Sequence, residues 1–341
     1  MARLGLVGVG RIGAFHAETL HGLAQVEEVL IADADPARAR DVAQALGAGA
    51  RWVADVDELF AQGLDGVAIA APTGAHAELI VRAVEAGLPV FCEKPVAPSG
   101  AQTAEVAELA RKAGGRVQIG FQRRFDAGYQ AARAAVADGS LGWVHTLRGG
   151  TFDPAPPPAA YIATSGGIFK DCGVHDYDAV RWVTGREAIE VYATGSNRGE
   201  PFFTEYGDVD TAAAVLRLDD GAIALLSATR YNGAGYDVRL EVLGSLDSIA
   251  VGVDERLPLR SAEPGVDRPA GPAYGGFMER FRDAYTRELA AFVEFAAGRA
   301  QSPCTIADAL EAIYIAEACE LSRVEGRPVR VDEVRMTGAR T

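Results

Sequence analysis

The stretch Gly8-Val9-Gly10-Arg11-Ile12-Gly13 constrains the fold of this chain more than any other feature. It follows an apolar run over residues 3–7 and precedes a segment with helical periodicity from residue 14 to about residue 23. In this pattern the first glycine permits a tight turn, the second lets the backbone approach a pyrophosphate, and the third lets the helix pack close to the strand. Because the pattern lies between a predicted strand and a predicted helix, it predicts a dinucleotide-binding βαβ unit.

An acidic residue stands at the end of the next predicted strand. Residues 28–32 have strand character and lead directly into Asp33, twenty residues after Gly13. A carboxylate at this position accepts hydrogen bonds from the adenosine ribose hydroxyls and repels a 2′-phosphate. The sequence therefore predicts NAD in preference to NADP. The alternative is that Asp33 serves only as a turn residue in Asp33-Ala34-Asp35-Pro36.

Strand-like and helix-like segments alternate through the first 121 residues. Further strands are expected over 65–71, 88–92 and 117–121, and helices over 57–60, from the Pro72 turn to about 87, and over 101–113. This order predicts a parallel, doubly wound sheet. Ligands of such sheets lie beyond the carboxyl ends of the strands. The turn Ala71-Pro72-Thr73, which leads into the helix carrying His76, and the residues after Cys92 are therefore expected at the cofactor site.

A lysine follows the predicted strand 88–92, in Glu93-Lys94-Pro95. Projecting into the crevice, its ammonium group would hydrogen-bond a substrate hydroxyl and favour an alkoxide-like transition state. Proline restrains the backbone after it, and the Lys94–Pro95 bond is of the kind that can be cis. The alternative is an ordinary exposed Lys-Pro turn.

The second half of the chain carries a glycine-rich turn that runs into a helix predicted to end at Gly185. At about 100° per residue, Asp171, His175, Asp178 and Trp182 fall on one face of this helix. Imidazole, with an ordinary pKa of about 6.5, can take and return a proton near neutrality. Neighbouring carboxylates can fix its tautomer and stabilise its charged form. The alternative is a solvated helix face with an ordinary Asp–His pair.

The remaining pattern of the second half predicts an α+β domain. Strands are expected over 143–149, 189–195, 211–218, 222–229, 236–243 and 247–253, and helices over 127–138, 277–297 and 306–324. The proline-rich residues 151–158 and the Gly- and Pro-rich residues 258–274 are expected to be loops. The predicted fold class is thus an α/β Rossmann domain over 1–121, followed over 122–341 by an α+β domain with a large, mostly antiparallel or mixed sheet.

Composition excludes several classes of partner. The 341 residues carry a net charge of −14 and have no Lys- or Arg-rich run, which argues against nucleic acid and anionic membranes. No apolar run is long enough to span a bilayer, and the N-terminus reads as a strand and not as a secretory signal. The four cysteines are scattered, as expected of reduced thiols in a cytoplasmic protein.

Four motifs in combination resemble the Gfo/Idh/MocA oxidoreductases: the Gly8–Gly13 loop, Ala71-Pro72-Thr73 with His76, Glu93-Lys94-Pro95, and Asp171-Cys172-Gly173-Val174-His175. The resemblance implies that Lys94, Asp171 and His175 are the catalytic residues and that the protein is a homo-oligomer, a dimer or a tetramer. It implies a cofactor site for NAD at Gly8, Gly10, Arg11, Ile12, Gly13, Asp33, Ala71, Pro72, Thr73, His76, Glu93, Lys94 and Gln122. It also implies a substrate site at Lys94, Arg124, Asp153, Asp171, His175 and Tyr236, and no metal. For Arg124, a salt bridge is the alternative.

Within this family, residues 153–162, 165–169 and 181–182 are most similar to the corresponding stretches of inositol 2-dehydrogenases. Thr151-Phe152 departs from the Ser-Arg expected there, which removes a cation that would bind a hydroxyl. The implied function is NAD-dependent oxidation of a secondary hydroxyl of a cyclitol or a related pyranose, a small-molecule polyol. The alternatives are the same fold acting on another aldose or a nucleotide sugar, a non-catalytic NAD(H) sensor, and a metal hydrolase that uses Asp171 and His175 as ligands.

Overall fold

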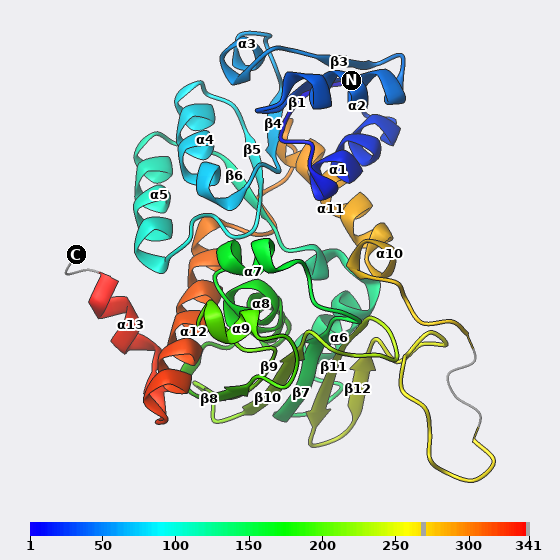
Figure 1. The fold of residues 1–341 in the computed structure, drawn as a ribbon, viewed down its shortest axis with the longest axis vertical. Coiled ribbons are helices and arrows are strands. Elements are labelled where there is room, and N and C mark those ends of the chain that lie inside the picture. Colours follow the sequence, from blue (N-terminus) through cyan, green and yellow to red (C-terminus); the bar gives the residue numbers. More distant parts are fainter. Residues whose placement is uncertain (267–270, 339–341) are drawn as a thin grey trace. The chain divides into compact units, whose positions relative to one another are not determined.

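The computed structural model describes residues 1–266 and 271–338. The chain packs as two compact units (Figure 1). Unit 1 comprises residues 1–125 and 283–310, and unit 2 comprises the described residues of 126–282 and 311–341. No helix in these described residues is both long and apolar enough to cross a membrane.

Unit 1 is built on a six-stranded sheet in the order β3-β2-β1-β4-β5-β6, in which every neighbouring pair is parallel. Its strands are β1 (Ala2–Val7), β2 (Val26–Ala32), β3 (Ala50–Trp52), β4 (Gly66–Ile69), β5 (Val90–Glu93) and β6 (Val117–Gly120). This is the strand order of the Rossmann fold. The predicted parallel, doubly wound sheet is therefore confirmed.

The helices of unit 1 connect successive strands. They are α1 (Arg11–Gly22), α2 (Pro36–Leu46), α3 (Val56–Phe60), α4 (Thr73–Glu85) and α5 (Gly100–Lys112), with the short helix η1 (Gln122–Phe125) after β6. The sequence interpretation omitted α2 and β3. Helix α2 buries only Ala39 and Ala43, so its apolar stripe is faint. Its start is nevertheless marked by Pro36 in the first turn and by the Asp35 side chain, which accepts a hydrogen bond from the Ala37 N–H.

Residues 283–310 return to unit 1, although the sequence placed them in the second domain. Helix α11 (Arg282–Ala296) carries Leu289, Phe292 and Val293 into the core formed by β1, β2 and α1. A side chain at Gly66 in β4 would lie 3.1 Å from the Phe292 ring, so glycine favours the close approach of α11 to this strand. The predicted domain boundary follows residue 121, whereas the first segment of unit 1 ends at residue 125. Residues 283–310, which belong to unit 1, interrupt the predicted second domain.

Unit 2 is built on a seven-stranded mixed sheet in the order β12-β11-β7-β10-β9-β8-β13. The strands are β7 (Val144–Phe152), β8 (Ala188–Ser196), β9 (Thr211–Leu218), β10 (Ile223–Thr229), β11 (Asp237–Gly244), β12 (Ser248–Val251) and β13 (Val329–Arg330). Only β7 and β10 pair in parallel. The sequence missed β13. The loop predicted from residue 151 was wrong for Thr151 and Phe152, because β7 pairs with both β10 and β11 as far as Phe152.

Helices cover one face of this sheet. The helices of unit 2 include α6 (Ala127–Ala137), α7 (Ala159–Ser165), η2 (Phe169–Gly173), α8 (Val174–Thr184), α9 (Phe202–Glu205), α10 (Phe277–Arg280), part of α12 (Ile306–Glu325) and α13 (Val331–Gly338). Of these, α6, η2, α8 and α13 contact strands of the sheet. Strand β9 alternates strictly between exposed and buried side chains, as expected when one face is covered. The predicted loop 258–274 includes residues 267–270, which lie outside the described residues, and its described parts contain only an isolated bridge at Tyr274.

Candidate active site

The glycine loop of unit 1 has the predicted division of roles. Gly8 has a φ of +89°, and a side chain there would lie 2.6 Å from the Ala71 nitrogen. A side chain at Gly13 would collide with the Gly8 carbonyl, whereas one at Gly10 would meet no atom within 4 Å. Gly8 and Gly13 are therefore required by the packing of the protein itself. Gly10 instead borders open space in front of α1.

The N-terminus of α1 presents backbone N–H groups to that space. Gly10 is the N-cap and supplies no side-chain cap, and the first turn, beginning with Arg11 and Ile12, contains no acidic residue. Uncapped N–H groups at the positive end of a helix bind phosphate. The residues present at this end of the sheet thus fit the pyrophosphate of a dinucleotide.

Asp33, directly after β2, is held against the glycine loop. Its Oδ2 accepts a hydrogen bond from the Val9 N–H at 2.7 Å, and its Oδ1 accepts one from the Asp35 N–H at 2.9 Å. The turn role of Asp33 is therefore observed, and its predicted contact with the adenosine ribose stays a prediction. Arg38 of α2 places Nη1 3.7 Å from Oδ1. The sequence interpretation did not single out this arginine.

The turn Ala71-Pro72-Thr73 joins β4 to α4, whose N-cap is Pro72. His76 is only 1% exposed, and its ring nitrogens face the carbonyl oxygens of Ala71 and Pro95, each at 2.7 Å. Both nitrogens are therefore used to tie this turn to the segment after β5. The structure gives His76 a supporting role beneath the cofactor turn. Its predicted contact with the cofactor stays a prediction.

The Lys94–Pro95 peptide bond is cis. Gln122 and Arg124 lie in η1, where both are buried. Arg124 donates a hydrogen bond to the Pro303 carbonyl at 2.9 Å and forms an ion pair with Asp308 at 3.3 Å. Lys94, Gln122 and Arg124 all belong to unit 1. The geometry of Arg124 therefore agrees with its alternative reading as a salt-bridge residue, in a buried setting.

In unit 2, a buried arginine joins two of the predicted site carboxylates. Arg230, the residue after β10, is 3% exposed. Its Nη1 lies 2.9 Å from Asp153 Oδ2 and its Nη2 lies 2.7 Å from Asp171 Oδ2. The Tyr161 hydroxyl donates to the other oxygen of Asp171 at 2.8 Å. We call these four side chains the Arg230 cluster.

In the Arg230 cluster, burial and ion pairing shift the pKa values of the charged groups in opposite directions. Burial raises the pKa of Asp153, and the charge and hydrogen bond of Arg230 oppose that rise. Burial acts to lower the pKa of Arg230, but neighbouring anionic groups including Asp171 and Asp153 outweigh it and raise the pKa overall. Desolvation and the charge of Asp171 raise the pKa of Tyr161, which therefore stays a hydrogen-bond donor. Arg230 thus contributes a positive charge that is shared by Asp153 and Asp171.

The predicted helix carrying Asp171 and His175 begins with a π-helical turn, η2, and continues as α8. A π turn holds more residues than an α turn, so an even spacing of about 100° per residue does not apply between Asp171 and His175. Asp178 is only 1% exposed, whereas Asp171 and His175 are partly exposed. The alternative of a solvated helix face is therefore wrong for Asp178, and the predicted common face of the four residues stays a prediction.

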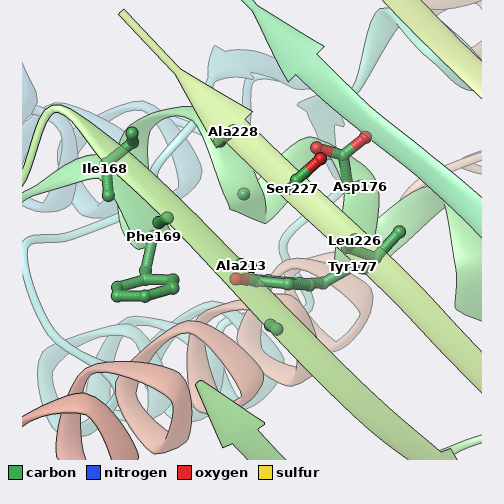
Figure 2. A pocket seen from close by; sticks show the side chains of 11 residues that line it. Ile168, Phe169, Asp176, Tyr177, Ala213, Leu226, Ser227 and Ala228 are labelled. Carbon is green, nitrogen blue, oxygen red and sulfur yellow. The ribbon is translucent and has the colours of Figure 1, made fainter. Parts of the chain in front are cut away.

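Two hydrogen bonds and packing against β9 and β10 hold this helix in unit 2. Asp208 Oδ1 accepts the Ile168 N–H at 2.9 Å at the helix start, and the Thr151 hydroxyl donates to Asp176 Oδ2 at 2.8 Å. Small side chains of β9 and β10 allow the close approach of η2 and α8, leaving a crevice lined by Tyr177 and neighbouring residues (Figure 2). The crevice holds at most about one water molecule. It is a packing gap beneath the helix and is too small for a polyol.

Phe152 lies apart from the helix-covered face at Thr151, whereas the register of β11 puts Tyr236 on the same face as Val238, the partner of Thr151. Side chains alternate along a strand, so Phe152 lies on the opposite face from Thr151, and its ring would be 3.0 Å from a side chain at Gly150. An arginine in place of Phe152 would therefore point away from Asp176, the partner of Thr151. Tyr236 is buried and donates its N–H to the Tyr274 carbonyl at 3.0 Å, and it lines a hollow that, like the crevice beneath α8, holds at most about one water molecule.

Comparison with known proteins decides the family. Residues 2–121 match the model of the oxidoreductase family with an NAD-binding Rossmann fold, and residues 129–250 match the GFO/IDH/MocA C-terminal domain. The chain belongs to the Gfo/Idh/MocA family. The protein is thus an NAD-dependent oxidoreductase of that family, as the sequence motifs predicted.

Several Gfo/Idh/MocA members are similar over almost the whole chain. The myo-inositol dehydrogenase Hyg17 of Streptomyces leeuwenhoekii is 41% identical over 94% of this chain and 97% of its own. A myo-inositol dehydrogenase structure from Corynebacterium glutamicum is 36% identical, with a TM-score of 0.88 over 97% of this chain and 98% of its own. A Lactobacillus casei scyllo-inositol dehydrogenase with bound NAD(H) and scyllo-inositol is 30% identical, with a TM-score of 0.86 over 97% and 99%.

The sequence interpretation of this Gfo/Idh/MocA chain missed Arg230 as a site residue. The only local signal was an arginine directly after an apolar strand, ahead of the turn Tyr231-Asn232-Gly233. It also quoted Tyr161 only for its likeness to relatives and did not assign it to the site. No group of three or more His, Cys, Asp or Glu side chains arranged to hold a metal occurs in residues 1–266 and 271–338.

Proposed function

We propose that this chain is an inositol 2-dehydrogenase, which oxidises a secondary hydroxyl of a cyclitol to a ketone with NAD. The observation that carries the proposal is the Arg230 cluster. In this cluster two carboxylates, Asp153 and Asp171, share one buried guanidinium, and Asp171 precedes His175 by four residues in the sequence. Carboxylates accept hydrogen bonds from hydroxyl groups, and a polyol presents several hydroxyls at fixed spacing. Near full-length similarity to inositol dehydrogenases supports the same substrate class.

Each proposed catalytic residue has a distinct task. His175 accepts the proton of the reacting hydroxyl, and Lys94 donates a hydrogen bond to the same oxygen as negative charge develops on it. Asp171, fixed through both carboxylate oxygens by Tyr161 and Arg230, orients the substrate. Bound NAD supplies the acceptor for the hydride of the carbinol carbon. Gly10, the start of α1 and Asp33 would hold its pyrophosphate and adenosine ribose.

A substrate panel tests the proposal. Purified protein is incubated with NAD and with myo-inositol, scyllo-inositol, glucose or a nucleotide sugar, and NADH formation is followed by absorbance. We expect turnover with at least one inositol. Turnover restricted to an aldose or a nucleotide sugar would replace the substrate and keep the dehydrogenase. Tight NADH binding without turnover on any polyol would favour an NAD(H) sensor.

Cofactor preference is expected to depend on Asp33 and Arg38 together. Asp33→Ser removes the carboxylate that repels a 2′-phosphate and leaves the Arg38 guanidinium, 3.7 Å from Asp33 Oδ1, without its acidic neighbour. Because juxtaposed like charges cost several kcal/mol, we expect the NADP/NAD ratio of kcat/KM to rise about 10- to 100-fold. The double variant Asp33→Ser with Arg38→Ala should lose most of this gain. An unchanged ratio in the single variant would reject the ribose contact.

We propose that the uncovered face of the unit 2 sheet forms the interface of a cytoplasmic homo-oligomer. This face exposes an apolar row of side chains, namely Tyr192, Val215, Ile223 and Leu225. A contiguous apolar patch of this kind marks an interaction surface. Leu225→Glu should lower the mass measured by light scattering, whereas Leu246→Glu, at an exposed leucine in the turn after β11, should not. A monomeric wild-type protein would contradict the proposal.

A further inference from the structure

A buried contact between a histidine and a carboxylate involves the residue directly before Lys94 in unit 1. His16, on α1, is 0% exposed, and its Nε2 lies 2.7 Å from Glu93 Oε1. Glu93 is the last residue of β5 and immediately precedes Lys94. The other oxygen of Glu93 accepts the Lys94 backbone N–H at 3.3 Å. One carboxylate therefore connects the cofactor-binding helix α1 to the backbone from which the lysine side chain projects.

The surroundings of this contact leave Glu93 little freedom. The His16 ring packs edge-on against Phe91 and Tyr285. Within the described residues, His16 Nδ1 has no hydrogen-bond partner, so Nε2 carries the directional contact. On the other side, a side chain at Gly120 would lie 3.3 Å from Glu93 Oε2. The Glu93 carboxylate is thus held between His16, the Lys94 N–H and the backbone of β6.

Stability alone does not account for a histidine at this position. A polar pair in an aromatic core is often no more stabilising than well-packed apolar residues of similar volume. Leu20, one turn further along α1, shows the apolar alternative, being fully buried in the core of unit 1. What His16 adds over such a residue is a directed hydrogen bond to the residue before Lys94.

We propose that His16 is a positioning residue for Lys94. By holding the Glu93 carboxylate, it fixes the end of β5 and with it the direction in which the lysine side chain leaves the backbone. The inference rests on the proposed role of Lys94 in the reaction. It assigns His16 no contact with substrate or cofactor. A displacement of about 1 Å in a group that acts on the reacting atoms can cost about 100-fold in rate.

The test uses substitutions that separate the hydrogen bond from packing. His16→Leu fills the space without a donor, and His16→Asn is polar but too short to reach Glu93. In His16→Gln the amide nitrogen takes the place of Nε2. We expect kcat to fall about 10- to 100-fold in the first two variants, with the Kd for NADH, measured by fluorescence, within about twofold of wild type. His16→Gln should restore most of kcat.

Leu20→Ala serves as the matched control, because it disturbs the same helix and the same core without touching Glu93. It should lower the thermal unfolding temperature while kcat per folded molecule stays unchanged at a permissive temperature. If His16→Leu and His16→Asn behave like Leu20→Ala, or if a folded, NADH-binding His16→Gln stays as slow as they are, His16 is only structural. If His16→Leu does not fold, the comparison of kcat between His16→Asn and His16→Gln decides whether the hydrogen bond to Glu93 matters.

A double variant separates the proposed role of Lys94 in the reaction from the inferred role of His16 in positioning it. In a Lys94→Ala background, His16→Leu should cause no further loss of the residual kcat, because there is no lysine left to position. Full activity of Lys94→Ala would refute the proposed role of the lysine. A defective Lys94→Ala together with a fully active His16→Leu would refute only the inference about His16. Additive losses in the double variant would likewise show that His16 acts by another route.

Discussion

Replacing His175 by alanine is expected to lower kcat by about 10²- to 10⁴-fold, because general base catalysis contributes a factor of that size. The helix that carries His175 is anchored by contacts that do not involve its imidazole, including Asp208 with the Ile168 N–H and Thr151 with Asp176. The variant should therefore fold normally. The cofactor loop lies in the other unit, so the Kd for NADH should stay near the wild-type value.

His145→Ala is the matched control for this variant. His145 is an exposed histidine of β7 in the same unit, so it controls for the loss of an imidazole as such. Its kcat and KM for an inositol should equal those of wild type. Wild-type turnover in His175→Ala would show that another group takes the proton. A raised KM with unchanged kcat would give His175 a role in binding alone.

The parts of the site that follow from local sequence were predictable. The glycine loop, the turn at Asp33 and the parallel, doubly wound class of the sheet follow from patterns of residues close together in the chain, and the structure has all three. Helix α2 has an equally local start signal at Asp35-Pro36, but its weak apolar stripe conceals it. The π turn of η2 could not be recognised from the spacing of apolar residues. That spacing is interpreted on the assumption of a regular α-helix with 3.6 residues per turn.

The Arg230 cluster was not predictable by such reasoning. Arg230 is 77 residues from Asp153 and 59 residues from Asp171 in the sequence. Its position depends on the parallel pairing of β10 with β7, which brings the end of one strand beside the end of the other. The return of residues 283–310 to unit 1 is a similar case, since amphipathic α11 has the same sequence pattern whichever sheet it covers.

Replacing Arg230 by methionine is expected to lower kcat/KM for the inositol by about 10²-fold, because Asp153 and Asp171 lose the group that positions them and a misplacement of about 1 Å costs about that factor. The variant leaves Asp153 and Asp171 without their shared cation. Burial already raises the pKa of Asp153, and the guanidinium is what opposes it. Without Arg230 the pKa of Asp153 rises further. The fraction of active, ionised carboxylate then falls at neutral pH and recovers as the pH increases.

The profile of kcat/KM against pH is the measurement that separates this effect from simple unfolding. Its acid limb should move to higher pH in Arg230→Met, so that the deficit against wild type shrinks as the solution becomes more alkaline. Arg148→Met, which removes an exposed arginine paired with Glu241 on the neighbouring strand, should leave the profile unchanged, because exposed pairs contribute little. An unmoved acid limb in Arg230→Met would mean that the ionisation of these carboxylates does not limit the reaction.

Arg230→Lys divides the role of the arginine into charge and geometry. An ammonium group keeps the positive charge, so the acid limb should return toward its wild-type position. It lacks the planar fork with which Arg230 contacts Asp153 through Nη1 and Asp171 through Nη2. One of the two carboxylates is then left loosely held, and kcat/KM should stay below wild type at every pH. Full recovery of kcat/KM in Arg230→Lys would show that the site needs only a buried cation and not the bidentate arrangement.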